Sequence, residues 1–83
     1  MRCYFVDKDY YGSDIKCLKR STVADCEYLC QNTVGCGKYS YVTEAYNGKQ
    51  GTSARRSCCL KQNVSVSLTD EKDIMSGPRI CHG

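Results

Sequence analysis

The fold of this chain is decided by residues 21–37, which read STVADCEYLCQNTVGCG. Ser21 or Thr22 can cap the start of a helix, and Thr22 stands three residues before Asp25, a spacing close to a capping box. Cys26 and Cys30 follow four residues apart, so both sulfurs lie on one stripe of that helix. We therefore expect two disulfides to fasten this helix to two different parts of the chain.

Composition indicates a small disulfide-rich domain. Among the 83 residues there are eight cysteines and one histidine. A chain of this length can bury only a small hydrophobic core, so its stability depends on cross-links. An even number of cysteines at this density indicates disulfides formed in an oxidising compartment. A zinc site is disfavoured, because Cys26 and Cys30 enclose three residues and the chain has no C-x2-C pair. We expect a secreted or extracellular protein without a metal or cofactor.

The ends of the chain bear on its domain organisation. The sequence shows no signal peptide, lipidation motif or apolar run long enough to insert in a membrane. Cys3 and Cys81 lie near the two ends. We expect residues 1–83 to be a single module cut from a multi-repeat extracellular protein. Asn63 begins a glycosylation sequon, which applies to a protein of the secretory pathway.

The net charge of +3 arises from twelve basic and nine acidic residues, and it does not indicate a nucleic-acid partner. Basic residues concentrate in two places, Lys16 with Lys19 and Arg20, and Arg55 with Arg56. Either group could meet an anionic partner such as an acidic glycan. The alternative is that both are solvated charges on an ordinary surface.

Short aromatic, β-branched or alternating runs predict five strands. These strands are expected at residues 3–6, 14–19, 38–42, 56–61 and 71–75. The polar residues 7–13 should connect the first two strands, Gly35 should end the helix, and residues 76–78 should form a turn. In the third strand, Tyr39 and Tyr41 share a face that is expected to pack on the helix. Lys38 and Ser40 should then face outward.

The segment 44–53 is the least hydrophobic of the chain and contains several turn residues, which predicts a mobile loop. Loops of this length often carry function. We take Tyr46, Lys49, Arg55 and Arg56, in and just after this loop, as the candidate binding surface.

Catalysis is disfavoured, and no residue is proposed as catalytic. The one histidine, His82, lies beside the end of the sequence, and cysteines committed to disulfides cannot act as thiolates. No phosphate-binding glycine motif is present. We expect a binding or structural module rather than an enzyme.

Five motifs, in order and at compatible spacing, resemble those of the PAN/apple domain family. They are GSDI at residues 12–15, Ser21 with Cys26-x3-Cys30, CGKYSY at 36–41, CCLK at 58–61, and IMSG at 74–77 followed by Cys81. The resemblance covers nearly the whole chain. It implies an α+β fold, in which a curved antiparallel sheet of about five strands cradles a single helix.

The resemblance also implies three disulfides. The family's bridges correspond to Cys3 with Cys81, Cys26 with Cys58, and Cys30 with Cys36. Cys17 and Cys59 lie outside that pattern and are expected to pair with each other. Because Cys58 and Cys59 are adjacent, they face opposite sides of a strand and bond to different partners, and an exchange of their roles stays open.

The ending SGPR at residues 76–79 looks more like the apple modules of apicomplexan microneme adhesins. That resemblance implies a non-catalytic module for protein or carbohydrate binding, acting in host-cell attachment. Its partners would be a host-cell surface protein or glycan and neighbouring apple modules, with storage in a secretory organelle such as the microneme. One alternative is a free-standing secreted effector, such as a small protease inhibitor or toxin-like peptide. Another is an architectural spacer without a ligand.

Overall fold

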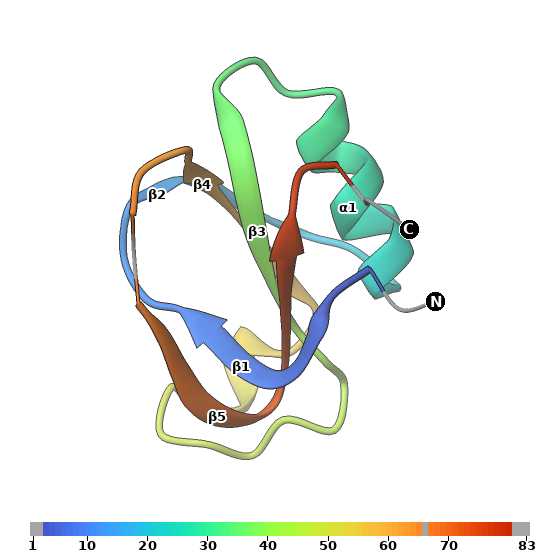
Figure 1. The fold of residues 1–83 in the computed structure, drawn as a ribbon. Helices are drawn as coiled ribbons and strands as arrows, with labels where there is room; N and C mark the ends of the chain where they lie inside the picture. The colour runs from blue at the N-terminus through green and yellow to red at the C-terminus, as the bar shows by residue number, and fades with distance from the viewer. Residues whose placement is uncertain (1–2, 66, 81–83) are drawn as a thin grey trace.

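A computed structural model describes residues 3–65 and 67–80, in which one α-helix packs on one face of a five-stranded antiparallel sheet (Figure 1). The elements are β1 (Phe5–Tyr10), β2 (Asp14–Lys19), α1 (Val23–Gln31), β3 (Cys36–Val42), the 3-10 turn η1 (Thr52–Ala54), β4 (Ser57–Gln62) and β5 (Leu68–Pro78). The strand order β1-β5-β3-β4-β2 places the first two strands at opposite edges. The predicted α+β fold is confirmed.

Helix α1 begins where the capping pattern predicts. The Thr22 hydroxyl accepts a hydrogen bond from the backbone N–H of Asp25 at 3.1 Å. The helix ends earlier than predicted, because Asn32 donates from its side chain to the carbonyl of Tyr28 at 2.8 Å and caps the last turn. Gly35 instead lies in the turn that leads into β3, with a φ of +87° that favours glycine.

The main core lies between α1 and the sheet. Its buried members are Cys26, Cys30, Cys36, Tyr39, Tyr41, Cys58 and Leu60, with Val23 and Leu29 packed against them. Tyr39 and Tyr41 therefore face the helix as predicted. Because two of the three bridges described below also lie in this layer, disulfide sulfur takes the place of part of the missing aliphatic core.

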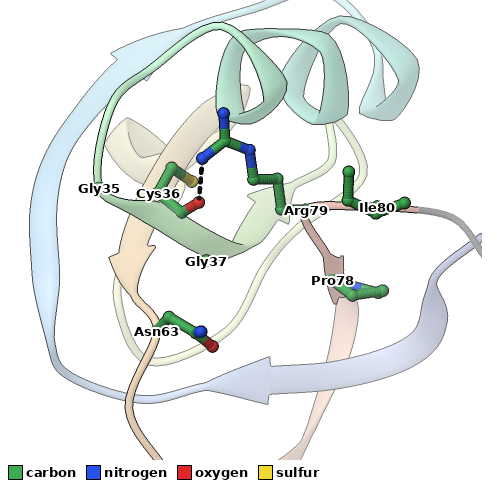
Figure 2. Close-up of a pocket in the computed structure, with 7 residues that line it drawn as sticks. All are labelled: Gly35, Cys36, Gly37, Asn63, Pro78, Arg79 and Ile80. Atoms are coloured by element: carbon green, nitrogen blue, oxygen red, sulfur yellow. Dashed lines mark hydrogen bonds between the residues drawn. The ribbon is translucent and has the colours of Figure 1, made fainter.

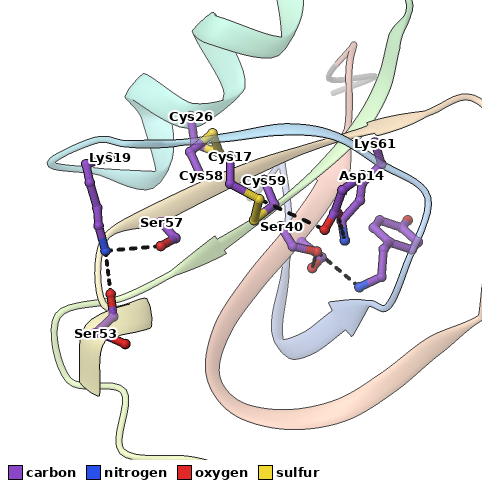
Figure 3. Close-up of a disulfide and its surroundings, with 12 residues drawn as sticks. Asp14, Cys17, Lys19, Cys26, Ser40, Ser53, Ser57, Cys58, Cys59 and Lys61 are labelled. Carbon is purple, nitrogen blue, oxygen red and sulfur yellow. Dashed lines mark hydrogen bonds and ion pairs between the residues drawn. A yellow bond between two sulfur atoms is a disulfide. The ribbon is translucent and has the colours of Figure 1, made fainter. Parts of the chain in front are cut away.

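Three predicted disulfides are confirmed. They join Cys26 to Cys58, Cys30 to Cys36, and Cys17 to Cys59. Figure 3 shows that the adjacent Cys58 and Cys59 bond on opposite sides of β4, Cys58 toward the helix and Cys59 toward β2. The predicted bridge between Cys3 and Cys81 lies outside the described residues, since Cys81 is not among them.

Two strand predictions are corrected by pairing between distant segments. β1 continues through the polar residues 7–10, which were predicted to be a connection. Lys8 lies opposite Asp70 of β5 and forms an ion pair with it, so cross-strand pairing outweighs the weak strand propensity of this segment. β5 similarly runs on through residues 76–78, predicted as a turn, because they pair with β3.

The sheet face turned away from α1, here called the second face, is also covered. The prediction that Ser40 faces outward is wrong: Ser40 is buried, and Lys38 is half-buried with its ammonium donating to the carbonyl of Val64 at 2.8 Å. The segment after β3 folds back onto this face, where Tyr46 packs with Val42 and Ile74 in a small second core. The segment predicted to be a mobile loop is thus anchored by a fully buried aromatic side chain.

Candidate functional site

A groove opens on the second face. A cavity of about 240 Å³ is lined by Asp9, Tyr11, Gly12, Asp14, Ser40, Val42, Gln50, Cys59, Lys61 and Ile74. A neighbouring hollow of about 420 Å³ shares three of these residues, Asp9, Tyr11 and Gln50, and adds Lys49, Thr69, Asp70 and Glu71. Strands β3, β4 and β5 supply the floor, and the ends of both edge strands supply walls. We call the two hollows together the groove.

The groove contains a buried ammonium group. The Lys61 side chain is 5% exposed, and its Nζ forms an ion pair with Asp14 at 2.5 Å (Figure 3). A register shift in β2 between Asp14 and Lys16 accompanies this pairing. An ammonium has three donors, and among residues 3–65 and 67–80 this carboxylate is its one bound partner. Lys61 therefore retains donors for a ligand.

The groove also contains a nearly buried carboxylate. Asp9 is 7% exposed, and its backbone carbonyl accepts a hydrogen bond from the Thr69 hydroxyl at 3.3 Å. Within the described part of the chain its side-chain oxygens accept no hydrogen bond and form no ion pair. Asp9 lines both hollows, and its carboxylate oxygens are not among the buried side-chain atoms that lack a partner, so they are open to the groove. A hydroxyl or amide group placed in the groove would supply the missing donor.

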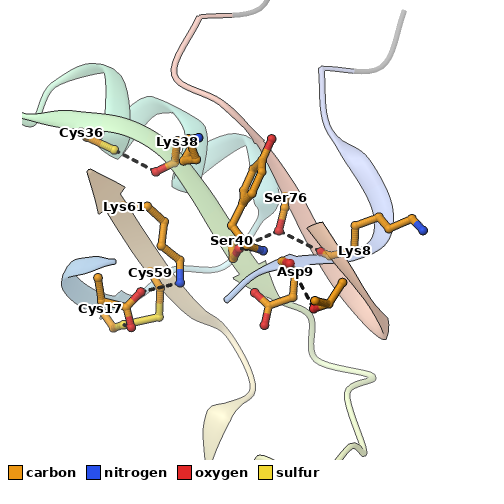
Figure 4. A network of polar contacts seen from close by, with 12 residues as sticks. Lys8, Asp9, Cys17, Cys36, Lys38, Ser40, Cys59, Lys61 and Ser76 are labelled. Atoms are coloured by element: carbon orange, nitrogen blue, oxygen red, sulfur yellow. Dashed lines mark hydrogen bonds and ion pairs between the residues drawn. A yellow bond between two sulfur atoms is a disulfide. The ribbon is translucent and has the colours of Figure 1, made fainter. Parts of the chain in front are cut away.

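A pair of serines fixes the floor of the groove. The Ser76 hydroxyl donates to the carbonyl of Lys8 at 2.8 Å, so the Ser40 hydroxyl donates to Ser76 at 2.6 Å and accepts from the N–H of Tyr10 at 3.1 Å (Figure 4). This network joins β1, β5 and β3 in a buried layer. Because its hydrogen-bonding capacity is used within the sheet, Ser40 has a structural role.

An exposed aromatic ring stands at the rim. Tyr11 is 75% exposed and lines both hollows. Gln50 beside it is positioned by its backbone N–H, which donates to the Tyr46 hydroxyl at 3.2 Å, and that hydroxyl donates to Glu71 at 2.7 Å. Burial raises the pKa of Tyr46, so this phenol stays protonated as a donor. The groove thus presents acceptors, donors and an aromatic face at fixed positions.

Comparison with known families agrees with this architecture, because a PAN domain model matches residues 8–61. The chain belongs to the PAN domain family. Members of this family are protein- or carbohydrate-binding modules and are generally non-catalytic. The match begins in β1 and ends in β4, so it includes the helix, its two cysteines and Lys61.

The predicted binding residues of this PAN domain do not form one surface. Tyr46 is fully buried, which corrects its placement on a contact surface. Lys49 lines the acidic end of the groove. Arg55 and Arg56 lie elsewhere, beside the end of β2, where the carbonyl of Arg56 accepts from the N–H of Arg20 at 2.9 Å. The binding roles of Lys49, Arg55 and Arg56 stay predictions.

Sequence reasoning missed the two charged residues that distinguish the groove. Lys61 belongs to the CCLK motif, but nothing local shows that it is buried, because its partner Asp14 lies on another strand. Asp9 sits in a polar run that was predicted as a connection. Only the pairing of edge strands β1 and β2 with their neighbours turns these two residues into one site.

A third hollow of the PAN domain has a structural explanation. It measures about 370 Å³ and is lined by Gly35, Cys36, Gly37, Asn63, Pro78, Arg79 and Ile80 (Figure 2). The Arg79 guanidinium donates to the carbonyls of Cys36 at 3.2 Å and Gln31 at 2.9 Å, so it closes the end of α1. A Cβ on Gly37 would lie 2.5 Å from the Cα of Asn63, so close packing of backbones requires glycine here.

One group of potential metal ligands lies among the described residues. Asp14, Cys17 and Cys59 place ligand atoms within 4.8 Å of one another, but the two sulfurs are bonded to each other and offer no thiolate. Over the residues that the structure describes, no helix is long and apolar enough to cross a membrane.

Proposed function

We propose that this PAN domain is an extracellular recognition module that binds a neutral sugar in the groove. One observation carries the proposal: a nearly buried carboxylate without donors and a buried ammonium with free donors line the same small cavity. Sugar hydroxyls both donate and accept, so a single ring can satisfy Asp9 and Lys61 together. The exposed ring of Tyr11 would cover the apolar face of that sugar.

Size and charge support a neutral ligand. The inner cavity of about 240 Å³ lies below the range of roughly 300–1,000 Å³ that drug-sized ligands occupy. This suits one sugar ring, with the neighbouring hollow free for the next. The groove is lined by four carboxylates, Asp9, Asp14, Asp70 and Glu71, and by two ammonium groups, Lys49 and Lys61. The ion pair with Lys8 neutralises Asp70, which leaves one more carboxylate than ammonium group. That excess of negative charge disfavours acidic sugars at this position.

The wider role we propose is host-cell attachment. The disulfide framework suits a secreted protein, and the sequence resemblance to microneme apple modules favours one repeat among several, which together would engage a host-cell surface glycan or protein. A free-standing effector is the alternative. In the full gene, sister modules beside this one would support the first role, whereas a signal peptide directly upstream and a stop codon after Gly83 would support the second.

Binding of neutral sugars tests the groove directly. We expect a neutral glycan to bind saturably on a glycan array, and its monosaccharide to shift NMR signals of Asp9, Tyr11 and Lys61. Asp9→Asn keeps the shape of the side chain but removes its charge, and Lys61→Gln removes the ammonium. Each should weaken binding by about 10- to 100-fold, the range for hydrogen bonds to charged groups.

The matched control is Lys72→Gln, which removes an exposed charge on β5 that does not line the groove. Its affinity should equal that of the wild type. Unchanged binding in both groove variants would reject this site. The absence of any neutral glycan ligand would reject the proposed ligand class.

A further inference from the structure

Two basic segments that are far apart in the sequence meet at one end of β2. The first contains Lys19 and Arg20, and the second contains Arg55 and Arg56. The backbone N–H of Arg20 donates to the carbonyl of Arg56 at 2.9 Å, and Lys19 lies opposite Ser57 in the pairing of β2 with β4. We call these four residues the basic edge.

Lys19 holds the two segments together. Its ammonium donates to the carbonyl of Ser53 at 2.6 Å and to the Ser57 hydroxyl at 3.2 Å (Figure 3). It also donates to the carbonyl of Arg55 at 2.7 Å. All three donors of the ammonium are therefore used. Lys19 adds charge to the basic edge, but its main role is to fix the backbone that carries Arg55 and Arg56.

The three arginines have defined positions and unused donors. Arg55 donates from Nε to the carbonyl of Tyr46 at 2.7 Å, and Arg20 donates from Nη1 to the carbonyl of Lys19 at 2.6 Å. The remaining N–H groups of both guanidinium groups are free of hydrogen bonds to the described residues. A guanidinium presents five donors, so each retains a fork for an anion.

Arg56 is held in an unusual backbone conformation. Its φ of +65° lies in the left-handed region, which is uncommon for a residue other than glycine. Its N–H donates to the carbonyl of Val42 at 2.6 Å while its carbonyl accepts from Arg20, so contacts on both sides enforce this conformation. The side chain is exposed. Strain of this kind persists where surrounding contacts over-determine the backbone, often at binding sites.

No carboxylate neutralises the basic edge. In residues 3–65 and 67–80, ion pairs join Lys8 to Asp70 and Lys61 to Asp14, and none involves the four residues of the edge. Within the described residues, the four cations of the basic edge are therefore not neutralised by an ion pair. Lys16 does not belong to the basic edge. In the pairing of β2 with β4 it lies opposite Leu60, which is a member of the core between the sheet and the helix.

We propose that the basic edge binds a sulfated polysaccharide chain, at a site separate from the groove. Guanidinium forks match the geometry of sulfate and related oxyanions. The side chains of Lys19 and Arg56 are exposed and those of Arg20 and Arg55 are half-buried, so the charges lie at the surface, where they suit an extended polyanion rather than one enclosed small anion. Sulfated polysaccharides are the abundant polyanions of the oxidising extracellular space in which disulfide-rich domains persist.

The test uses heparin as a highly sulfated probe, with the folded domain. The variant Arg20→Gln with Arg56→Gln removes two charges from the edge. The control Lys16→Gln with Lys72→Gln removes two exposed charges from other surfaces, so both proteins have the same net charge. We expect the edge variant to bind heparin about tenfold more weakly and elute at lower salt, while the control stays within twofold of wild type.

A second variant guards against misfolding. Arg56→Gly removes one guanidinium while glycine adopts the observed left-handed backbone without strain, so this protein should fold. We expect heparin affinity to fall about threefold, which corresponds to the free energy of one exposed ion pair. Desulfated heparin should not bind the wild type.

Four outcomes would overturn the proposal. The first two are that the wild type does not bind heparin, or that it binds phosphatidylserine vesicles and not heparin. The other two are that the edge and control variants lose equal amounts of heparin affinity, or that both edge variants bind heparin as tightly as the wild type. Asp9→Asn separates the two sites: it should abolish most neutral-sugar binding and leave heparin binding unchanged. Failure of the groove proposal thus leaves this one standing, and the reverse also holds.

Discussion

Two tyrosines with equal burial differ in what their hydroxyls contact. Both Tyr39 and Tyr46 are fully buried. The Tyr46 hydroxyl donates to Glu71 at 2.7 Å and accepts from the N–H of Gln50 at 3.2 Å. The Tyr39 hydroxyl has no hydrogen-bond partner among the described residues. Burial of an unpaired hydroxyl is unfavourable, whereas a paired one stabilises the fold.

This difference predicts opposite effects of the same substitution. Tyr46→Phe should lower the free energy of unfolding by about 1–3 kcal/mol, because it leaves a backbone N–H and a carboxylate in part-buried positions without their partner. Tyr39→Phe should change it by less than about 0.5 kcal/mol or raise it, since no hydrogen bond is lost. Urea unfolding monitored by circular dichroism measures both. A larger loss at Tyr39 than at Tyr46 would contradict this account.

At the scale of elements, the disulfides attach the helix and an edge strand by different means. Cys26–Cys58 joins α1 to β4 and lies fully inside the core, whereas Cys17–Cys59 joins β2 to β4 and Cys17 is exposed. The two bridges have similar sequence separations, 32 and 42 residues. The two bridges therefore reduce the entropy of the unfolded chain by nearly equal amounts, and they differ in how deeply they are buried.

Removing each bridge should consequently have different results. Cys17→Ser with Cys59→Ser should leave a folded domain whose free energy of unfolding is lower by about 2–4 kcal/mol. Cys26→Ala with Cys58→Ala should prevent stable folding, because it also empties the centre of the main core. Circular dichroism, thermal unfolding and NMR dispersion distinguish these outcomes. Equal effects of the two pairs would show that chain entropy alone sets the contribution of each bridge.

Element positions follow from sequence where a local rule applies. The helix start is set by Thr22 and Asp25, and the alternation of Tyr39 and Tyr41 marks the strand that packs on it. The limits of β1 and β5 were mispredicted, because both strands are held by partners far away in the sequence: Lys8 of β1 pairs with Asp70, and Ser76 of β5 pairs with Ser40. Local propensity carries no information about such pairing.

Four buried or partly buried tyrosines make the stability of the whole domain depend on pH in the alkaline range. Burial raises the pKa of Tyr10, Tyr39, Tyr41 and Tyr46 above the ordinary value of 10. In the unfolded chain these phenols ionise near pH 10. The folded state keeps them neutral to higher pH, so their contribution to stability is fully present below pH 10 and is lost as pH rises through the folded pKa values.

We therefore expect the free energy of unfolding to be nearly constant from pH 8 to about 9.5 and to fall steeply above it. Urea titrations at each pH measure this, and absorbance at 295 nm should rise on unfolding at pH 11, when the buried phenols ionise. Tyr46→Phe should fall less steeply than wild type because it lacks one of these groups. A stability that is flat or rises to pH 11 would contradict the assignment.

The sequence by itself determined the disulfide-rich class and the capped helix, because these depend on composition and on spacing within a short segment. Its ordered motifs, through their resemblance to the PAN/apple family, implied the α+β fold and the three described bridges, and the structure decided which partner each of Cys58 and Cys59 takes. Tertiary structure alone decided where binding can occur. It buried Tyr46, brought Asp9 and Lys61 to one groove, and joined Lys19 and Arg20 to Arg55 and Arg56. The physical reason is the strand order: β2 pairs with β4, and β1 with β5, so residues some 40 to 60 positions apart become neighbours through backbone pairing that no local periodicity records.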